Sequence, residues 1–166
     1  LSEKMLVNAK RRSLSTLMGK CELLVGNGIK LPFRDNTFDA VYISGSLHHF
    51  ADPVSGMQEI CRVAKPGGTI AVMEPNRFFP LNLIHAILNP FERNILQMCR
   101  HNLLKWSSVL PLTDITVANF IYTPPLSFIS STFLNRIDAV FEKVPVISGC
   151  SIMVYLSAKK INIKRK

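Results

Sequence analysis

Apolar residues along this chain are grouped into short runs separated by polar turns, and this pattern predicts strands joined by a helix. Residues 21–25 form one apolar run, and residues 38–44 are rich in aromatic and β-branched side chains; a glycine follows each run. Residues 69–73 form a third run of the same kind. Between the second and third runs, apolar side chains recur at helical spacing, so we expect a helix lying on a parallel sheet. The apolar face of this helix consists of Val54, Met57, Ile60, Cys61 and Ala64.

Residues at both ends of this helix indicate where it begins and stops. Asp52 is suited to cap the helix and Pro53 to occupy its first turn, while Pro66-Gly67-Gly68 is suited to end it. The carboxyl ends of parallel strands meet at one edge of a sheet, and ligands bind there. We therefore expect the chemistry where the three strands end, at Gly26-Asn27-Gly28, at residues 44–49 and at Glu74-Pro75-Asn76.

The second half of the chain predicts helices and two further strands. Residues 78–112 contain two helical pieces divided near Pro90, and residues 126–143 form a helix between the strands predicted at 115–122 and 150–158. One apolar stripe runs through both pieces of the first segment. Its members are Ile84, Ile87, Leu88 and Phe91, followed by Ile95, Met98, Cys99 and Leu103.

Composition restricts the class of protein. With 166 residues, 48% of them hydrophobic and 19% charged, the chain is long enough for one domain with a core and is not disordered. Residues 78–112 are the most apolar segment, but prolines and charges interrupt them, so no membrane span is expected. The four cysteines are widely spaced, without metal-binding pairs, which favours reduced thiols and a cytoplasmic protein. They are Cys21, Cys61, Cys99 and Cys150.

The net charge of +9 depends strongly on a basic tail. Residues 159–166 contain five of the 20 lysines and arginines. Such a tail can bind RNA or an anionic membrane, but a solvated chain end after the last strand is the favoured interpretation. Nucleic acid is accordingly disfavoured as a partner, and the oligomeric state is left open.

Several motifs occur in an order that resembles a known family. After Gly26-Asn27-Gly28 come Leu31-Pro32-Phe33, Phe38-Asp39, His48-His49 and the segment from Arg62 to Gly68, RVAKPGG. These motifs, over roughly the first half of the chain, resemble the class I S-adenosylmethionine-dependent methyltransferases of the small-molecule, type 11 branch. The resemblance implies an α/β fold with a Rossmann-like methyltransferase sheet, mostly parallel, with a C-terminal antiparallel strand.

The resemblance also implies a partial domain. The family sheet has the strand order 3-2-1-4-5-7-6, and residues 21–25 would be its third strand. The first two strands, with their glycine-rich loop and ribose-binding acid, have no counterpart here, so an N-terminally truncated fragment is expected that binds S-adenosylmethionine poorly alone. Residues 1–158 would form the partial domain and 159–166 the tail. Residues 78–112 would cover the substrate, although an ordinary sheet-covering helix or an amphipathic, membrane-surface helix remains an alternative.

Cofactor-binding residues are implied by the same resemblance. Asn27 and the Gly28 amide would meet the adenine, because an amide oxygen can accept from its exocyclic amine. Asn27 as a simple turn residue is the alternative. Ser2 and Met5 would lie near the ribose and adenine, but residues 2–13 also predict a helix that Ser2 caps. The methionine part of the cofactor would lie beside the end of the second predicted strand, next to Ser44, Gly45 and Leu47.

Two histidines are the catalytic candidates. Methyl transfer from a sulfonium needs a base only when the acceptor atom carries a proton, and a neutral imidazole of His48 or His49 could take it. Ordering of the loop is the alternative role. No metal is expected, because adjacent histidines lack a third ligand at suitable spacing. Glu74 is a further titratable side chain at this edge, for which capping or pairing with Arg77 is the plainer interpretation.

Three functions compete at this point. The apolar segment 78–112 favours a methyltransferase acting on a small-molecule or lipid-like acceptor. The basic tail is the local support for an RNA methyltransferase. A non-catalytic, truncated relative that serves as an interaction subunit is the third hypothesis, since the glycine-rich cofactor loop is not among these 166 residues.

Overall fold

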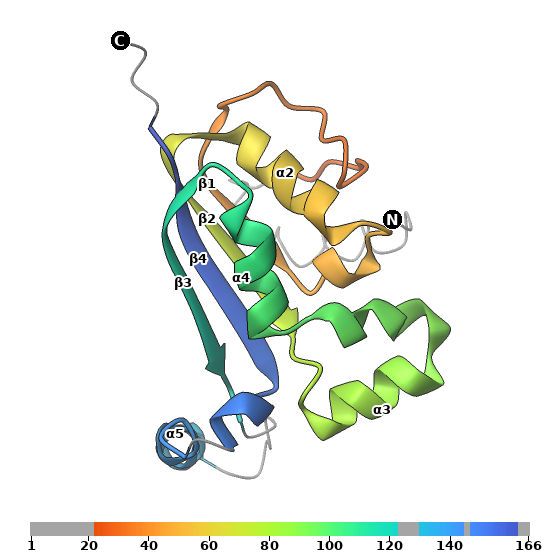
Figure 1. Cartoon of the computed structure of the whole chain (residues 1–166), viewed down its shortest axis with the longest axis vertical. Coiled ribbons are helices and arrows are strands. Elements are labelled where there is room, and N and C mark those ends of the chain that lie inside the picture. The colour runs from red at the N-terminus through yellow and green to blue at the C-terminus, as the bar shows by residue number, and fades with distance from the viewer. Residues whose placement is uncertain (1–21, 123–129, 145–146, 163–166) are drawn as a thin grey trace. The chain divides into compact units, whose positions relative to one another are not determined.

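A four-stranded sheet organises the C-terminal unit of the protein. The computed structural model describes residues 22–122, 130–144 and 147–162. The chain divides into two units, Leu1–Pro32 and Phe33–Lys166, and each is considered by itself. In the second unit the sheet order is β1-β2-β4-β3 (Figure 1). The strands are β1 (Phe38–Ser44), β2 (Ala64–Pro75), β3 (Leu112–Phe120) and β4 (Met153–Lys160).

Strand direction confirms the predicted class of fold. β1 pairs with β2 in parallel, whereas β4 lies antiparallel to both β2 and β3. Three strands therefore run one way and the C-terminal strand runs against them. The order β1-β2-β4-β3 reproduces the 4-5-7-6 half of the methyltransferase sheet. β1 and β3 are the edges of this described sheet, and β3 carries an irregularity between Thr113 and Thr116, with Asp114 at φ 53°.

The predicted helix and its start at Asp52-Pro53 are confirmed, but its predicted end is wrong: the helix ends at Val63, and Pro66-Gly67-Gly68 lie in β2. α2 (Pro53–Val63) begins after Asp52, whose carboxylate accepts from the Val54 amide at 3.0 Å and from the Ser55 amide at 3.2 Å. After α2, Gly67 adopts a φ of 79°, and a Cβ on Gly68 would lie 2.8 Å from the carbonyl oxygen of Lys65. The two glycines therefore permit an irregular start of β2, which begins at Ala64, before the predicted residue 69.

Three helical pieces, where two were expected, follow β2. They are α3 (Pro80–Leu88), the 3₁₀ helix η2 (Pro90–Gln97) and α4 (Arg100–Ser108). α2 and α4 lie on the same face of the sheet, while α3 and η2 extend beyond the carboxyl end of β2 (Figure 1). Shorter elements complete the described fold: η1 (Leu47–His49), α5 (Ser131–Phe141) and η3 (Ile147–Cys150).

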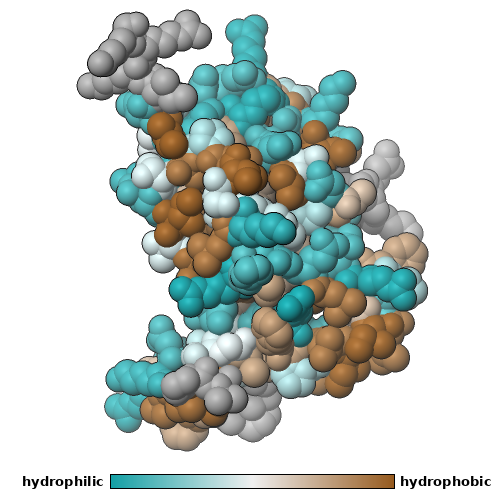
Figure 2. Space-filling model, viewed as in Figure 1, coloured by the Kyte–Doolittle hydropathy of each residue, from teal (hydrophilic) through white to brown (hydrophobic). Residues whose placement is uncertain are grey.

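The predicted apolar stripe of residues 78–112 divides into an exposed half and a buried half. On α3 and η2, Leu88 is 76% exposed and Phe91 is 86% exposed, and Figure 2 shows hydrophobic surface gathered over α3. Met98, which follows η2, and Leu103, which lies on α4, are fully buried. Leu103 joins the core that α2 and the sheet form. None of the helices in the described ranges is both long and apolar enough to cross a membrane.

The prediction of a strand at residues 21–25 is wrong for residues 22–25, which are the part of it that the structure describes. Residues 22–25 form no strand, and the described part of the first unit contains only the isolated bridge between Asn27 and Lys30. Leu24 and Val25 are exposed. An apolar run becomes a strand only where a neighbouring strand supplies hydrogen bonds, and the sequence pattern does not report that neighbour. The helix predicted at 2–13 lies outside the described residues.

The last strand includes residues that were assigned to the basic tail. Lys159 and Lys160 both belong to β4. The Lys160 ammonium donates to Asn36 Oδ1 at 2.8 Å and to the carbonyl of Ala64, at the end of α2, at 2.9 Å. The Lys159 ammonium is instead well exposed and lies 3.7 Å from Asp114. Lys160 therefore ties β4 to the carboxyl end of α2.

Replacing Lys160 with methionine is expected to lower the free energy of unfolding by about 1–2 kcal/mol. The change removes charge-assisted hydrogen bonds to a helix end while it keeps the apolar stem. Lys159→Met is the matched control and should change stability by less than about 0.5 kcal/mol, because exposed ion pairs contribute little. Urea denaturation of both variants measures the difference; equal effects would contradict the role given to Lys160.

Candidate active site at the carboxyl edge of the sheet

The main chain after β1 forms an open turn at the carboxyl edge of the sheet. Ser44 ends the strand, and Gly45 follows with a φ of 53°, a conformation that favours glycine. The Gly45 amide donates to the carbonyl of Met73 on β2 at 2.8 Å. Among the described residues, leaving aside the two chain neighbours of Gly45, no atom lies within 4 Å of the position that a Cβ on Gly45 would take. A cofactor chain can therefore approach this main chain closely, as the resemblance implies.

Glu74 anchors the segment that follows this turn. Its side chain is fully buried, and Oε1 accepts hydrogen bonds from the amides of Ser46, at 3.0 Å, and Leu47, at 2.8 Å. Of the two roles left open for Glu74, capping is observed, here at the start of η1. Pairing with Arg77 is wrong, since the Arg77 guanidinium donates to the carbonyl of Leu96.

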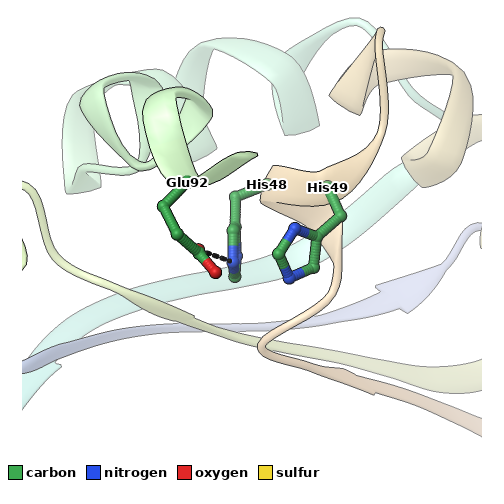
Figure 3. Close-up of side chains that lie close together, drawn as sticks. All are labelled: His48, His49 and Glu92. Atoms are coloured by element: carbon green, nitrogen blue, oxygen red, sulfur yellow. Dashed lines mark hydrogen bonds and ion pairs between the residues drawn. The ribbon is translucent and has the colours of Figure 1, made fainter. Parts of the chain in front are cut away.

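His48 lies between two carboxylates. The imidazole is buried, with Nδ1 2.5 Å from Glu74 Oε2 and Nε2 3.1 Å from Glu92 Oε2 (Figure 3). Burial acts to lower the pKa of His48. The hydrogen bond and charge of Glu74, followed by those of Glu92, outweigh burial and raise this pKa above its ordinary value. The raised pKa favours the protonated ring, which donates to both carboxylates, so His49 is the better placed of the two histidines to act as a neutral base, and the role of His48 as a base stays a prediction.

His49 is the more accessible of the two catalytic candidates. Its side chain is exposed, and its ring centroid lies 4.0 Å from that of His48. The two rings lie side by side with the Glu92 carboxylate (Figure 3). A base at this edge would therefore be His49, and that role stays a prediction.

Glu92 is the member of this cluster that sequence reasoning missed. It lies in the first turn of η2, 44 residues after His48, and its carboxylate is about one-fifth exposed. Within the sequence, Glu92 only interrupts an apolar segment. The one signal that could have found it was the resemblance, which implied that the segment 78–112 covers the site.

The other predicted cofactor residues have different surroundings. Leu47 is fully buried in the core and its amide is bound to Glu74, so the structure gives it a packing role. In the first unit, Asn27 Oδ1 accepts from the Ile29 amide at 3.2 Å, a contact typical of a turn residue. Ser2 and Met5 lie outside the described residues. Cofactor binding stays a prediction for all of the named residues: Ser2, Met5, Asn27, Gly28, Ser44, Gly45 and Leu47.

The sheet order and the polar edge above define the fold of a class I methyltransferase, and comparison with solved structures confirms it. A S-adenosylmethionine-dependent methyltransferase from Thermotoga maritima, described as a possible histamine N-methyltransferase, aligns with a TM-score of 0.65 and 18% identity over 90% of this chain and 69% of that one. A putative methyltransferase from Bacillus halodurans aligns with a TM-score of 0.62 and 18% identity over 97% of this chain and 80% of that one.

Sequence comparison finds similarity to methyltransferases in the first half of the chain. Residues 1–72 match the type 11 model of the methyltransferase domain, the family that the motifs of this chain resemble. The demethylmenaquinone methyltransferase of Corynebacterium kroppenstedtii is 54% identical over 52 residues, or 31% of this chain and 23% of the relative. That of Shouchella clausii is 40% identical over 76 residues, or 46% of this chain and 32% of the relative. The chain thus spans a third or less of these relatives' length.

Proposed function

We propose that this protein takes part in transferring a methyl group from S-adenosylmethionine to a small apolar acceptor of the quinone type. The observation that carries the proposal is the identity of 40–54% to demethylmenaquinone methyltransferases over 52–76 residues. The family match over residues 1–72 and the half-sheet of a class I methyltransferase support the same chemistry.

The surface of α3 supports an apolar acceptor. Its exposed apolar side chains lie on the helix that precedes η2, and η2 supplies the Glu92 that reaches His48. An aromatic or lipid-like acceptor can therefore contact apolar surface while its reacting end lies at the polar edge. The exposed apolar side chains on α3 are Leu81, Leu83, Ile84, Ile87 and Leu88, and Phe78 before α3 and Phe91 on η2 are exposed as well.

Each part of the site has a role in this proposal. The cofactor supplies the methyl group on a sulfonium. The open main chain at Ser44 and Gly45 accommodates the cofactor, and the residues around it hold the acceptor in line with the methyl group. His49 accepts the proton that the acceptor loses, while the Glu74–His48 pair holds η1 and thereby positions His49.

The test uses S-adenosylmethionine with an isotopically labelled methyl group, added to the protein expressed from its full reading frame. A reduced quinone, a polar amine and an RNA pool serve as alternative acceptors. We expect label in the reduced quinone, and a loss of about 100-fold in kcat for His49→Gln. His85→Gln, an exposed histidine on α3, should leave the rate unchanged. Label in RNA alone, or in no acceptor while the cofactor binds, would refute the proposal.

Cofactor binding by the 166-residue chain alone is a separate question. We propose that it is weak, because the glycine-rich loop and ribose-binding acid that the resemblance implies are not in this sequence. Calorimetry with S-adenosylmethionine measures it directly. Micromolar binding by this chain would contradict the expectation, without affecting the acceptor assignment.

A further inference from the structure

We propose that His48, His49 and Glu92 form a binding site for a divalent transition-metal ion, of which zinc is the best match. One potential ligand atom from each side chain lies within 4.8 Å of the other two. The cluster joins η1 to η2, two segments that are far apart in sequence (Figure 3). The proposal does not depend on the methyltransferase activity, since metal binding is measured without cofactor or acceptor.

The distance between two of the ligand atoms already suits a bound ion. Zinc lies about 2.0–2.1 Å from imidazole nitrogen and carboxylate oxygen, so two ligands in a tetrahedral site are roughly 3.3 Å apart. His48 Nε2 and Glu92 Oε2 are separated by 3.1 Å. His49 is exposed, and one of its ring nitrogens lies within 4.8 Å of the potential ligand atoms of His48 and Glu92, so it can supply the third protein ligand.

Glu74 supplies the outer contact that metal-binding histidines commonly have. The fully buried carboxylate accepts from His48 Nδ1, which fixes the ring orientation and leaves Nε2 directed at Glu92. Carboxylate–histidine–metal arrangements of this kind raise the basicity of the ligating nitrogen. The metal ion would replace the proton on His48 Nε2, and that proton would pass to solvent.

The ligand set determines which ion and what role are expected. Two imidazoles and one carboxylate favour zinc or a similar transition metal over magnesium or calcium, which prefer oxygen ligands. Three protein ligands with an exposed His49 leave a fourth position open to water or to an acceptor oxygen. The bound metal would therefore lie at the same edge as the proposed acceptor, and a His49 nitrogen that ligates the metal would not at the same time accept the proton from that acceptor.

Cobalt(II) titration of the 166-residue chain tests the site. We expect d–d absorption of a four- or five-coordinate ion that saturates at one equivalent, without a thiolate charge-transfer band, and that zinc abolishes. His49→Gln and Glu92→Gln should each weaken binding at least about tenfold, and Glu74→Gln about 10–100-fold. His85→Gln, the matched exposed histidine, should bind as the parent does.

Two results would overturn the proposal. The first is no cobalt absorption at one equivalent in a chain whose circular dichroism shows it to be folded, which would leave Glu74, His48 and Glu92 as a hydrogen-bond network only. The second is binding that survives His49→Gln combined with Glu92→Gln, which would place the ion elsewhere. Imidazole ¹⁵N spectra give an independent measurement: zinc should shift the signals of His48 and His49 and leave those of His85 and His101 unchanged.

Discussion

Replacing Glu74 with alanine is expected to lower the free energy of unfolding by about 4 kcal/mol or more. The change leaves the amides of Ser46 and Leu47 without their acceptor and leaves the buried His48 imidazole without its main counter-charge. Loss of one partner from a buried charged pair costs roughly 3–5 kcal/mol, and each buried amide without an acceptor adds to this. Thermal or urea denaturation measures the effect.

Two further variants make this prediction decisive. Glu74→Gln keeps the shape and one acceptor oxygen, so it should fold and lose roughly half as much stability as Glu74→Ala. Asp39→Ala removes an exposed carboxylate that pairs with Lys65 at 2.8 Å, and should cost less than about 0.5 kcal/mol. If Glu74→Ala were no more harmful than Asp39→Ala, Glu74 would not be the anchor of η1.

Replacing Leu103 with alanine is expected to cost about 2–5 kcal/mol of unfolding free energy. Leu103 is fully buried on α4 and contacts the core that α2 and the sheet share, so its loss leaves a cavity among elements that cannot easily close it. Leu104→Ala, at the next position and 39% exposed, should cost less than about 1 kcal/mol. Comparable losses for the two variants would show that α4 is not packed as described.

The local signals in the sequence predicted the elements of the second unit well. Asp52 as the cap of α2 and the glycine pair near the start of β2 both have a direct backbone reason, and such reasons act over a few residues. The apolar periodicity of residues 78–112 located helices but not their surroundings. Periodicity shows which side chains share a face, and it does not show whether that face is covered, as at Leu103, or exposed, as at Leu88.

The candidate site was predicted in part. Strand ends located His48, His49 and Glu74 at one edge, because the geometry of parallel strands requires it. Their partners were not predictable in this way. Glu92 lies on a 3₁₀ helix whose position depends on tertiary packing. Glu74 pairs with His48 and not with Arg77 because the His48 side chain lies inside the core, which the sequence does not show. The strand prediction at residues 22–25 failed for a related reason. A strand needs a neighbouring strand to bond with, and its own residues do not specify that neighbour.

The two edges of the sheet differ in what they can accept. β3 is irregular, with Asp114 in a left-handed conformation, and such bulges hinder the docking of another strand. β1 is irregular between Phe38 and Ala40 and then runs regularly to Ser44 against β2, and it contains no residue with a left-handed φ. We therefore expect any further strand, from this protein or from another polypeptide, to pair with β1 rather than with β3.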